Sequence, residues 1–169
     1  MEIDEDTVSG WQCGRIDTLP SIWLERGLTP PKGGTTMAIN GGCLCGRVRY
    51  EVAGGLSGAD HCHCSRCRRQ HGAAFATYAD LDPADFRWTA GAAFVKVYET
   101  SSGAGWCFCS ECGSSLAGTV NGEVTAITLG TVEGDPGVTP GFHIFVGSRA
   151  PWYEISDDIP QFDERPPAT

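Results

Sequence analysis

Residues 61–67 read His61-Cys-His-Cys-Ser-Arg-Cys67, so cysteine occupies three of seven consecutive positions. Two further cysteine pairs occur in the chain, Cys43-Leu-Cys45 and Cys109-Ser-Glu-Cys112. Spacings this short let one piece of backbone direct two sulfurs at one metal ion, and zinc in proteins is held tetrahedrally by sulfur and nitrogen ligands. The three clusters together therefore predict zinc binding.

The clustered cysteines do not divide evenly between two zinc ions. Four thiolates close a structural site, whereas three leave one coordination position open, as in zinc sites that take water or substrate. We expect the pairs at 43/45 and 109/112 to share the structural ion, because neither pair can satisfy zinc alone. Its ligands are then Cys43, Cys45, Cys109 and Cys112, and the catalytic ion is left with Cys62, Cys64 and Cys67.

A histidine could instead close the second site as a fourth ligand, because imidazole binds zinc well. In an extended segment, His61 and His63 would point away from the face that carries Cys62 and Cys64. Such a placement suits a donor to sulfur or a proton acceptor near the metal better than a ligand. The histidines considered as a fourth ligand are His61, His63, His71 and His143.

The donor set of the second site favours sulfur chemistry. Three thiolates already donate much charge to the zinc, so the ion activates water less well than one held by neutral imidazoles. A substrate thiol, in contrast, loses its proton on coordination at neutral pH and is held as a nucleophile. We therefore expect the protein to act on a small thiol.

Composition limits the class of partner. The chain has 169 residues with 23 glycines and 10 prolines, which is typical of one loop-rich domain. Its net charge of −9 argues against a nucleic-acid partner. Five arginines in residues 47–69 either offset the charge of the thiolates or attract an anionic substrate. They are Arg47, Arg49, Arg66, Arg68 and Arg69.

The sequence predicts a soluble, cytoplasmic protein with no membrane partner. Its first residues are acidic rather than basic and apolar as in a secretory signal, and no stretch approaches the roughly 20 apolar residues of a membrane span. Clustered cysteines in a reducing compartment are metal ligands more often than disulfides.

Residues 1–36 differ from the rest in being acidic and then interrupted by proline, with no sustained hydrophobic period. We expect them to be a flexible extension, or sequence upstream of the native start, before a zinc-binding domain at 37–169. No role is assigned to Cys13. Cys107 could pair with Cys109 as a rival two-ligand unit, but a strand through Phe108 favours it as a small buried apolar residue.

Short strands are expected from residue 41 onward. Alternation predicts a strand over 47–52, extending back to place Cys43 and Cys45 on one face, and further strands over 73–78 and 94–98. Asn121-Gly122 predicts a hairpin between 115–120 and 123–129. A helical turn is expected at 82–86 and a short helix over 65–71, ended by Gly72. The aromatic residues of 143–153 are expected to pack over the sheet edge rather than to contact substrate.

Four segments together resemble the glutathione-dependent formaldehyde-activating enzyme family, which includes centromere protein V, and the likeness covers about residues 40–163. The segments are Gly42-Cys-Leu-Cys-Gly-Arg-Val-Arg-Tyr50, His61-Cys-His-Cys-Ser-Arg-Cys-Arg-Arg69 with Gly72-Ala-Ala-Phe75, Phe108-Cys-Ser-Glu-Cys-Gly-Ser-Ser-Leu116, and His143-Ile-Phe-Val-Gly-Ser-Arg-Ala-Pro-Trp152.

The resemblance implies a mainly β, tent-like zinc fold with few short helical turns. It also implies the same division of the cysteines between a structural and a catalytic zinc. The associated reaction condenses glutathione with formaldehyde to S-hydroxymethylglutathione, which is classed as a carbon–sulfur lyase reaction in reverse and detoxifies formaldehyde. Alternatives are the same site acting on another small thiol or electrophile, and a zinc-stabilised binding module without catalysis. The oligomeric state stays open.

Overall fold

The structure, a computed structural model, describes residues 38–167. These residues form a mainly β fold, as predicted, with one short α-helix and several single 3-10 turns. The strands are β1 (Ile39–Gly42), β2 (Arg49–Val52), β3 (Gly58–Cys62), β4 (Ala76–Asp80), β5 (Phe86–Ala90), β6 (Val95–Glu99), β7 (Ala104–Cys109), β8 (Ser115–Val120), β9 (Glu123–Thr128) and β10 (His143–Ile144), and the helix is α1 (Ser65–His71).

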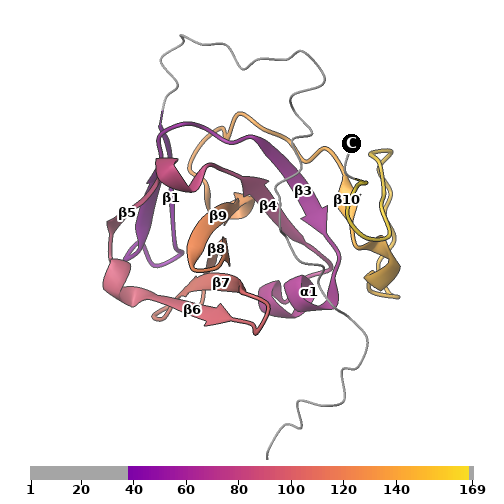
Figure 1. Cartoon of the computed structure of the whole chain (residues 1–169), viewed down its shortest axis with the longest axis horizontal. Coiled ribbons are helices and arrows are strands. Elements are labelled where there is room, and N and C mark those ends of the chain that lie inside the picture. The colour runs from indigo at the N-terminus through magenta and orange to yellow at the C-terminus, as the bar shows by residue number, and fades with distance from the viewer. Residues whose placement is uncertain (1–37, 168–169) are drawn as a thin grey trace, which may run out of the picture. The chain divides into compact units, whose positions relative to one another are not determined.

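The strands make two sheets (Figure 1). One has three antiparallel strands in the order β1-β2-β5, and the other has seven in the order β10-β3-β4-β9-β8-β7-β6. Pairing in the larger sheet is antiparallel except that β10 runs parallel to β3. Tyr50 and Val52 of the small sheet pack with Ala79 and Ile127 of the large sheet, and all four are fully buried. This apolar contact joins the two sheets.

Helix α1 begins where β3 ends, as Figure 1 shows. Cys64 is its N-cap, and the Cys64 sulfur accepts a hydrogen bond from the Cys67 N–H at 3.3 Å. Gly72 ends the helix with φ 60°, a left-handed conformation that glycine adopts at little cost. The predicted helix over 65–71 is therefore confirmed, with Cys67 in its first turn.

Two other local predictions are also confirmed. The Asn121-Gly122 turn joins β8 to β9, and both turn residues have positive φ, 51° and 84°. Pro83–Asp85 forms a 3-10 turn, and the Asp82 side chain accepts a hydrogen bond from the Ala84 N–H at 2.9 Å. Sequence signals that operate over two to four residues thus hold in the folded chain.

The strand predicted over 47–52 does not extend back to the first cysteine pair. Residues 43–48 form a tight turn instead, in which the Cys43 C=O accepts from the Gly46 N–H at 3.0 Å and Gly46 has φ 74°. The strand predicted over 73–78 begins only at Ala76. The Ala73 N–H still donates to the Arg68 C=O at 3.1 Å, so the hydrogen bonds that end the helix delay the start of the strand.

Predictions about residues 1–36 and Cys13 lie outside the residues that the structure describes. Between residues 38 and 167, every helix is too short or too polar to span a lipid bilayer.

Candidate metal centres

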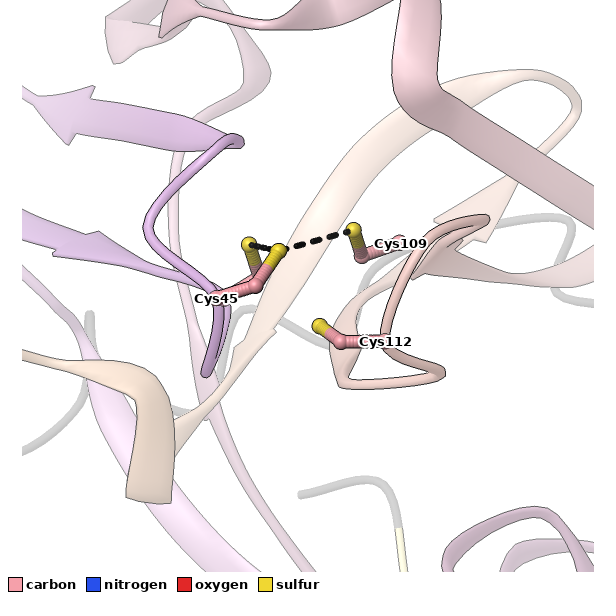
Figure 2. Close-up of side chains that lie close together, drawn as sticks. Cys45, Cys109 and Cys112 are labelled. Atoms are coloured by element: carbon pink, nitrogen blue, oxygen red, sulfur yellow. Dashed lines mark hydrogen bonds between the residues drawn. The ribbon is translucent and has the colours of Figure 1, made fainter.

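The four-cysteine cluster joins two turns that are far apart in the sequence. Cys43 and Cys45 come from the turn after β1, and Cys109 and Cys112 come from the end of β7 and the turn that follows it. Figure 2 shows the Cys45, Cys109 and Cys112 side chains pointing toward one another. All four sulfurs lie within 4.8 Å of one another. The structure thus brings together the residues predicted for the closed site.

The sulfur spacing fits a tetrahedral metal site. Zinc–sulfur bonds of about 2.3 Å at tetrahedral angles place neighbouring sulfurs about 3.8 Å apart. Cys43 and Cys45 sulfurs are 3.4 Å apart, and Cys45 and Cys109 sulfurs are 3.9 Å apart. A zinc ion therefore fits this cluster with little movement of its ligands.

Hydrogen bonds from the surrounding chain stabilise negative charge on these sulfurs. The Val48 N–H donates to the Cys43 sulfur at 3.2 Å. The Ser114 hydroxyl lies 3.3 Å from the Cys112 sulfur and lowers the pKa of Cys112 to about 6. The same hydroxyl oxygen accepts from the Leu44 N–H at 2.9 Å, so Ser114 also ties the two turns together. Since thiolates are the metal-binding form of cysteine, this arrangement favours a cation.

The three-cysteine cluster forms at the junction of β3 and α1. Cys62 ends the strand, Cys64 caps the helix and Cys67 lies in its first turn, and their sulfurs lie within 4.8 Å of one another. Cys62 and Cys67 are buried. The close spacing follows from the change of direction between strand and helix, which folds the third sulfur back toward the first two.

The three thiols of this cluster titrate together. Hydrogen bonding with Cys62, and then with Cys67, holds the pKa of Cys64 far below its usual value. The reciprocal bond with Cys64 raises the pKa of Cys62 to about 12, and bonds with Cys62 and Cys64 raise the pKa of Cys67. Only one sulfur of the three is therefore readily ionised without a metal, and a bound cation would stabilise the other thiolates.

Among the described residues, no histidine joins the three sulfurs as a fourth ligand within the same distance. His61 Nδ1 lies 2.8 Å from the Thr77 hydroxyl, and His63 Nε2 lies 2.8 Å from His143 Nδ1. His71 Nε2 lies 2.8 Å from the Tyr78 hydroxyl. The alternative of a closed site with three cysteines and one histidine is therefore not formed, and one position of a tetrahedral ion would stay open.

A polar network links helix α1 to the turn that carries the four-cysteine site. The Ser115 hydroxyl donates to Gln70 Oε1 at 2.9 Å and lies 3.3 Å from His71 Nε2. Its neighbour Ser114 bonds to the four-cysteine cluster, so two adjacent serines connect that cluster to the end of helix α1. The sequence carries no signal for this link, because serine is common in turns.

The arginines near the second cluster have different surroundings. Arg68 is used within the fold, since its guanidinium donates to the His63 C=O at 3.2 Å and to the Ser148 C=O at 3.1 Å. Arg66 and Arg69 are exposed on the helix. These two remain available for an anionic ligand. Arg47 pairs loosely with Glu111, and Arg49 pairs with Glu133.

Two predictions about single residues have different outcomes. Cys107 is 2% exposed within an apolar cluster and belongs to neither metal group, as expected for a small buried residue. Trp152 is 71% exposed, and although its ring lies 6.4 Å from that of Tyr153, the residue is not buried over the sheet edge as expected. Tyr153 does pack, with its ring 5.5 Å from Phe75 and 5.9 Å from His63.

Comparison with known proteins matches residues 38–148 to the family described as glutathione-dependent formaldehyde-activating enzyme. Among solved structures, the chain is similar to the crystal structure of a Rhodobacter sphaeroides protein at 33% identity and a TM-score of 0.46, over 57% of this chain and 89% of that chain. None of the curated proteins matches the chain. The matched range contains all seven cysteines of the two clusters.

Proposed function

The chain belongs to the glutathione-dependent formaldehyde-activating enzyme family, and we propose that it condenses glutathione with formaldehyde to S-hydroxymethylglutathione. The observation that carries the proposal is the three-cysteine cluster at the β3–α1 junction, with three sulfurs within 4.8 Å and no described histidine among them. The reverse reaction is that of a carbon–sulfur lyase.

In this proposal, Cys43, Cys45, Cys109 and Cys112 hold a structural zinc ion, and Cys62, Cys64 and Cys67 hold a catalytic one. The catalytic ion, when bound, supplies the positive charge that keeps a substrate thiol ionised at neutral pH. The cysteines orient that charge and leave one position free. Arg66 and Arg69, exposed on α1, attract the carboxylates of glutathione.

The chemical step forms one carbon–sulfur bond. The thiolate sulfur adds to the carbonyl carbon of formaldehyde, and the carbonyl oxygen takes up one proton, so the thiol proton is balanced by the new hydroxyl. Cys62 and Cys67 are buried, which keeps water from their sulfurs, whereas Cys64 is half-buried. In this proposal the substrate therefore enters on the side of Cys64.

The division of roles between the clusters predicts two different outcomes for cysteine-to-serine variants. Cys112→Ser should unfold or precipitate the protein, because the free energy of zinc binding at a closed site, roughly 10 kcal/mol or more, contributes to folding. Cys67→Ser should lose one zinc and keep its fold. Zinc content and circular dichroism measure both, with Cys107→Ser as a control outside the clusters. Two zincs and a native spectrum in both variants would contradict the assignment.

The reaction itself is tested by exchange NMR. The wild-type protein should accelerate exchange between glutathione plus formaldehyde and the hydroxymethyl adduct above the spontaneous rate, and Cys64→Ser at equal concentration should not. S-methylglutathione should bind much more weakly than glutathione, because it cannot supply a thiolate to the metal. Equal affinity for the two would exclude metal–sulfur coordination. Tight thiol binding without acceleration would point to another electrophile.

A further inference from the structure

A hydrogen-bonded chain of three side chains ends beside the three-cysteine cluster. His143 Nε2 lies 3.0 and 3.2 Å from the two carboxylate oxygens of Asp157, and His143 Nδ1 lies 2.8 Å from His63 Nε2. Both imidazole rings are fully buried, whereas the Asp157 side chain is 49% exposed. The chain thus runs from a surface carboxylate to the residue between Cys62 and Cys64.

The carboxylate determines where the ring protons lie. An ionised Asp157 only accepts hydrogen bonds, so His143 must carry its proton on Nε2. In a neutral His143 ring, Nδ1 is then a lone pair, and the facing nitrogen of His63 must be the donor. His63 therefore carries its proton on Nε2 and leaves Nδ1 as a bare acceptor. That Nδ1 has no hydrogen-bond partner among the described residues, and it is buried.

Other contacts fix His63 from its backbone. Its N–H donates to the Ile144 C=O at 2.9 Å, and its C=O accepts from Arg68 Nε at 3.2 Å. Arg68 also donates to the Ser148 C=O. The backbone of residue 63 is thus held by β10 and by Arg68 of α1, which also bonds to the segment after β10, and the hydrogen bond from the His63 ring to His143 restrains the side chain.

The segment that supplies these contacts is anchored in turn. The His143 N–H donates to the Pro160 C=O at 2.8 Å, the Phe162 N–H donates to the His143 C=O at 2.9 Å, and the Ile159 N–H donates to Asp157 Oδ1 at 3.2 Å. Asp157 lies beyond the matched family range of 38–148. A residue outside the matched range is therefore linked through two imidazoles to the segment that carries Cys62 and Cys64.

We propose that Asp157 is a positioning residue for the three-cysteine cluster: acting through His143, it sets the tautomer and orientation of the His63 ring and so holds the backbone between Cys62 and Cys64. Metal ligands are commonly oriented by partners one contact away, and loss of such a partner lowers metal affinity or activity about 10- to 100-fold. The proposal rests on the proposed function only in assuming that this cluster binds a metal.

The first test measures the ring protons by nitrogen-15 NMR of labelled histidines. In the wild type, His63 and His143 should each show one protonated nitrogen, at Nε2, and one bare nitrogen, at Nδ1. Asp157→Ala should move the two nitrogen shifts of each ring toward averaged values. Asp157→Asn should retain the wild-type pattern, because Ile159 holds an oxygen beside His143 Nε2. Asp158→Ala removes the same charge from the neighbouring exposed position and should change nothing.

The second test measures metal binding with cobalt as the probe. Asp157→Ala should weaken cobalt binding at the three-cysteine cluster about tenfold or more and leave the four-cysteine cluster unchanged as an internal reference. Variants with Cys67→Ser identify the spectrum of each cluster.

Two outcomes would overturn the proposal: a proton on Nδ1 of either ring in the wild type, or unchanged ring shifts and cobalt affinity in Asp157→Ala. The wild-type ring measurement requires no variant, so it remains decisive if Asp157→Ala does not fold. Wild-type protein that binds no metal at the three-cysteine cluster, yet shows the expected ring protons, would refute the proposed function while leaving the tautomer assignment intact.

Discussion

At the scale of single residues, the chemistry of the clusters depends on which groups donate to sulfur. A backbone N–H group donates to one sulfur in each site, to Cys43 and to Cys64, and the Ser114 hydroxyl bonds to the Cys112 sulfur of the four-cysteine site. Such bonds favour the thiolate form that binds a metal. The close approach of three thiols has the opposite effect on Cys62 and Cys67, whose protons must leave on metal binding. We therefore expect metal affinity at this cluster to fall as the pH falls, because protons compete for the same sulfurs.

Asp60 predicts a pH dependence of stability that is separate from the metal. Burial, and then the nearby Asp80 charge, raises the pKa of Asp60 from 3.8 to about 7. Asp60 Oδ1 is buried with no hydrogen-bond partner among the described residues. Because the folded-state pKa exceeds the unfolded one, the stability from protonated Asp60 is complete below about pH 4 and is lost as the pH rises through 7.

Asp60→Asn should therefore raise the melting temperature relative to the wild type by more at pH 8 than at pH 5, because the free-energy penalty of burying Asp60 grows between about pH 4 and pH 7. Thermal unfolding with saturating zinc at both pH values measures this, since metal-linked effects are common to both proteins. Asp158→Asn, at an exposed position, is the control. A melting difference that does not change with pH would show that Asp60 does not titrate in this window.

At the scale of elements, the short turns carry most of the local information. The β8–β9 hairpin needs positive φ at Asn121 and Gly122, and both cysteine pairs are followed by a glycine with positive φ, at Gly46 and Gly113. These glycines let the chain reverse within a few residues, which is how two sulfurs on one turn approach one ion. Helix α1 depends on Gly72 in the same way.

Gly122→Ala tests the hairpin. A side chain at φ 84° is strained, so the substitution should lower the free energy of unfolding by roughly 1–2 kcal/mol. Gly130→Ala is a matched control, because Gly130 has no positive φ and an added Cβ would meet no atom within 4 Å. Urea unfolding of the zinc-loaded protein measures both. Equal destabilisation by the two substitutions would argue against conformational strain as the cause.

At the scale of the whole molecule, the four-cysteine site joins the edge of the small sheet to the β7–β8 turn of the large sheet. Cys45 and Cys109 are 64 positions apart in sequence, yet their sulfurs are 3.9 Å apart. A metal at this site closes a long loop, which restricts the unfolded chain and stabilises the contact between the sheets.

The boundary of the domain is a prediction at this scale. A chain that begins at Met37 should retain two zincs and a melting temperature within a few degrees of the full chain, because terminal segments without a periodic apolar face contribute little. Removal of β1 as well, by a start at Gly42, should destabilise the domain, since β1 pairs along its length with β2. Differential scanning calorimetry compares the three proteins. A large loss on starting at Met37 would place residues 1–36 within the folded domain.

The sequence alone determined the features that arise over a few residues. The α1 helix with its glycine cap, the Asn121-Gly122 hairpin and the grouping of cysteines all follow from local backbone preferences and ligand spacing, which act without the rest of the fold. The division of the cysteines was also predicted, because ligand counting needs no coordinates. Two local predictions failed where neighbouring structure competes: the turn at 43–48 replaces a strand, and the end of α1 delays β4.

Only the tertiary structure decided the contacts between distant segments. The bond from His143 to His63, the use of Arg68 to hold residues 63 and 148, and the exposure of Trp152 depend on where β10 and the chain after it lie. No periodicity or spacing encodes these partners, because they are set by the parallel pairing of β10 with β3 across some 80 residues. Side chains that face each other there are brought together by packing of the whole domain rather than by the conformational preference of either segment.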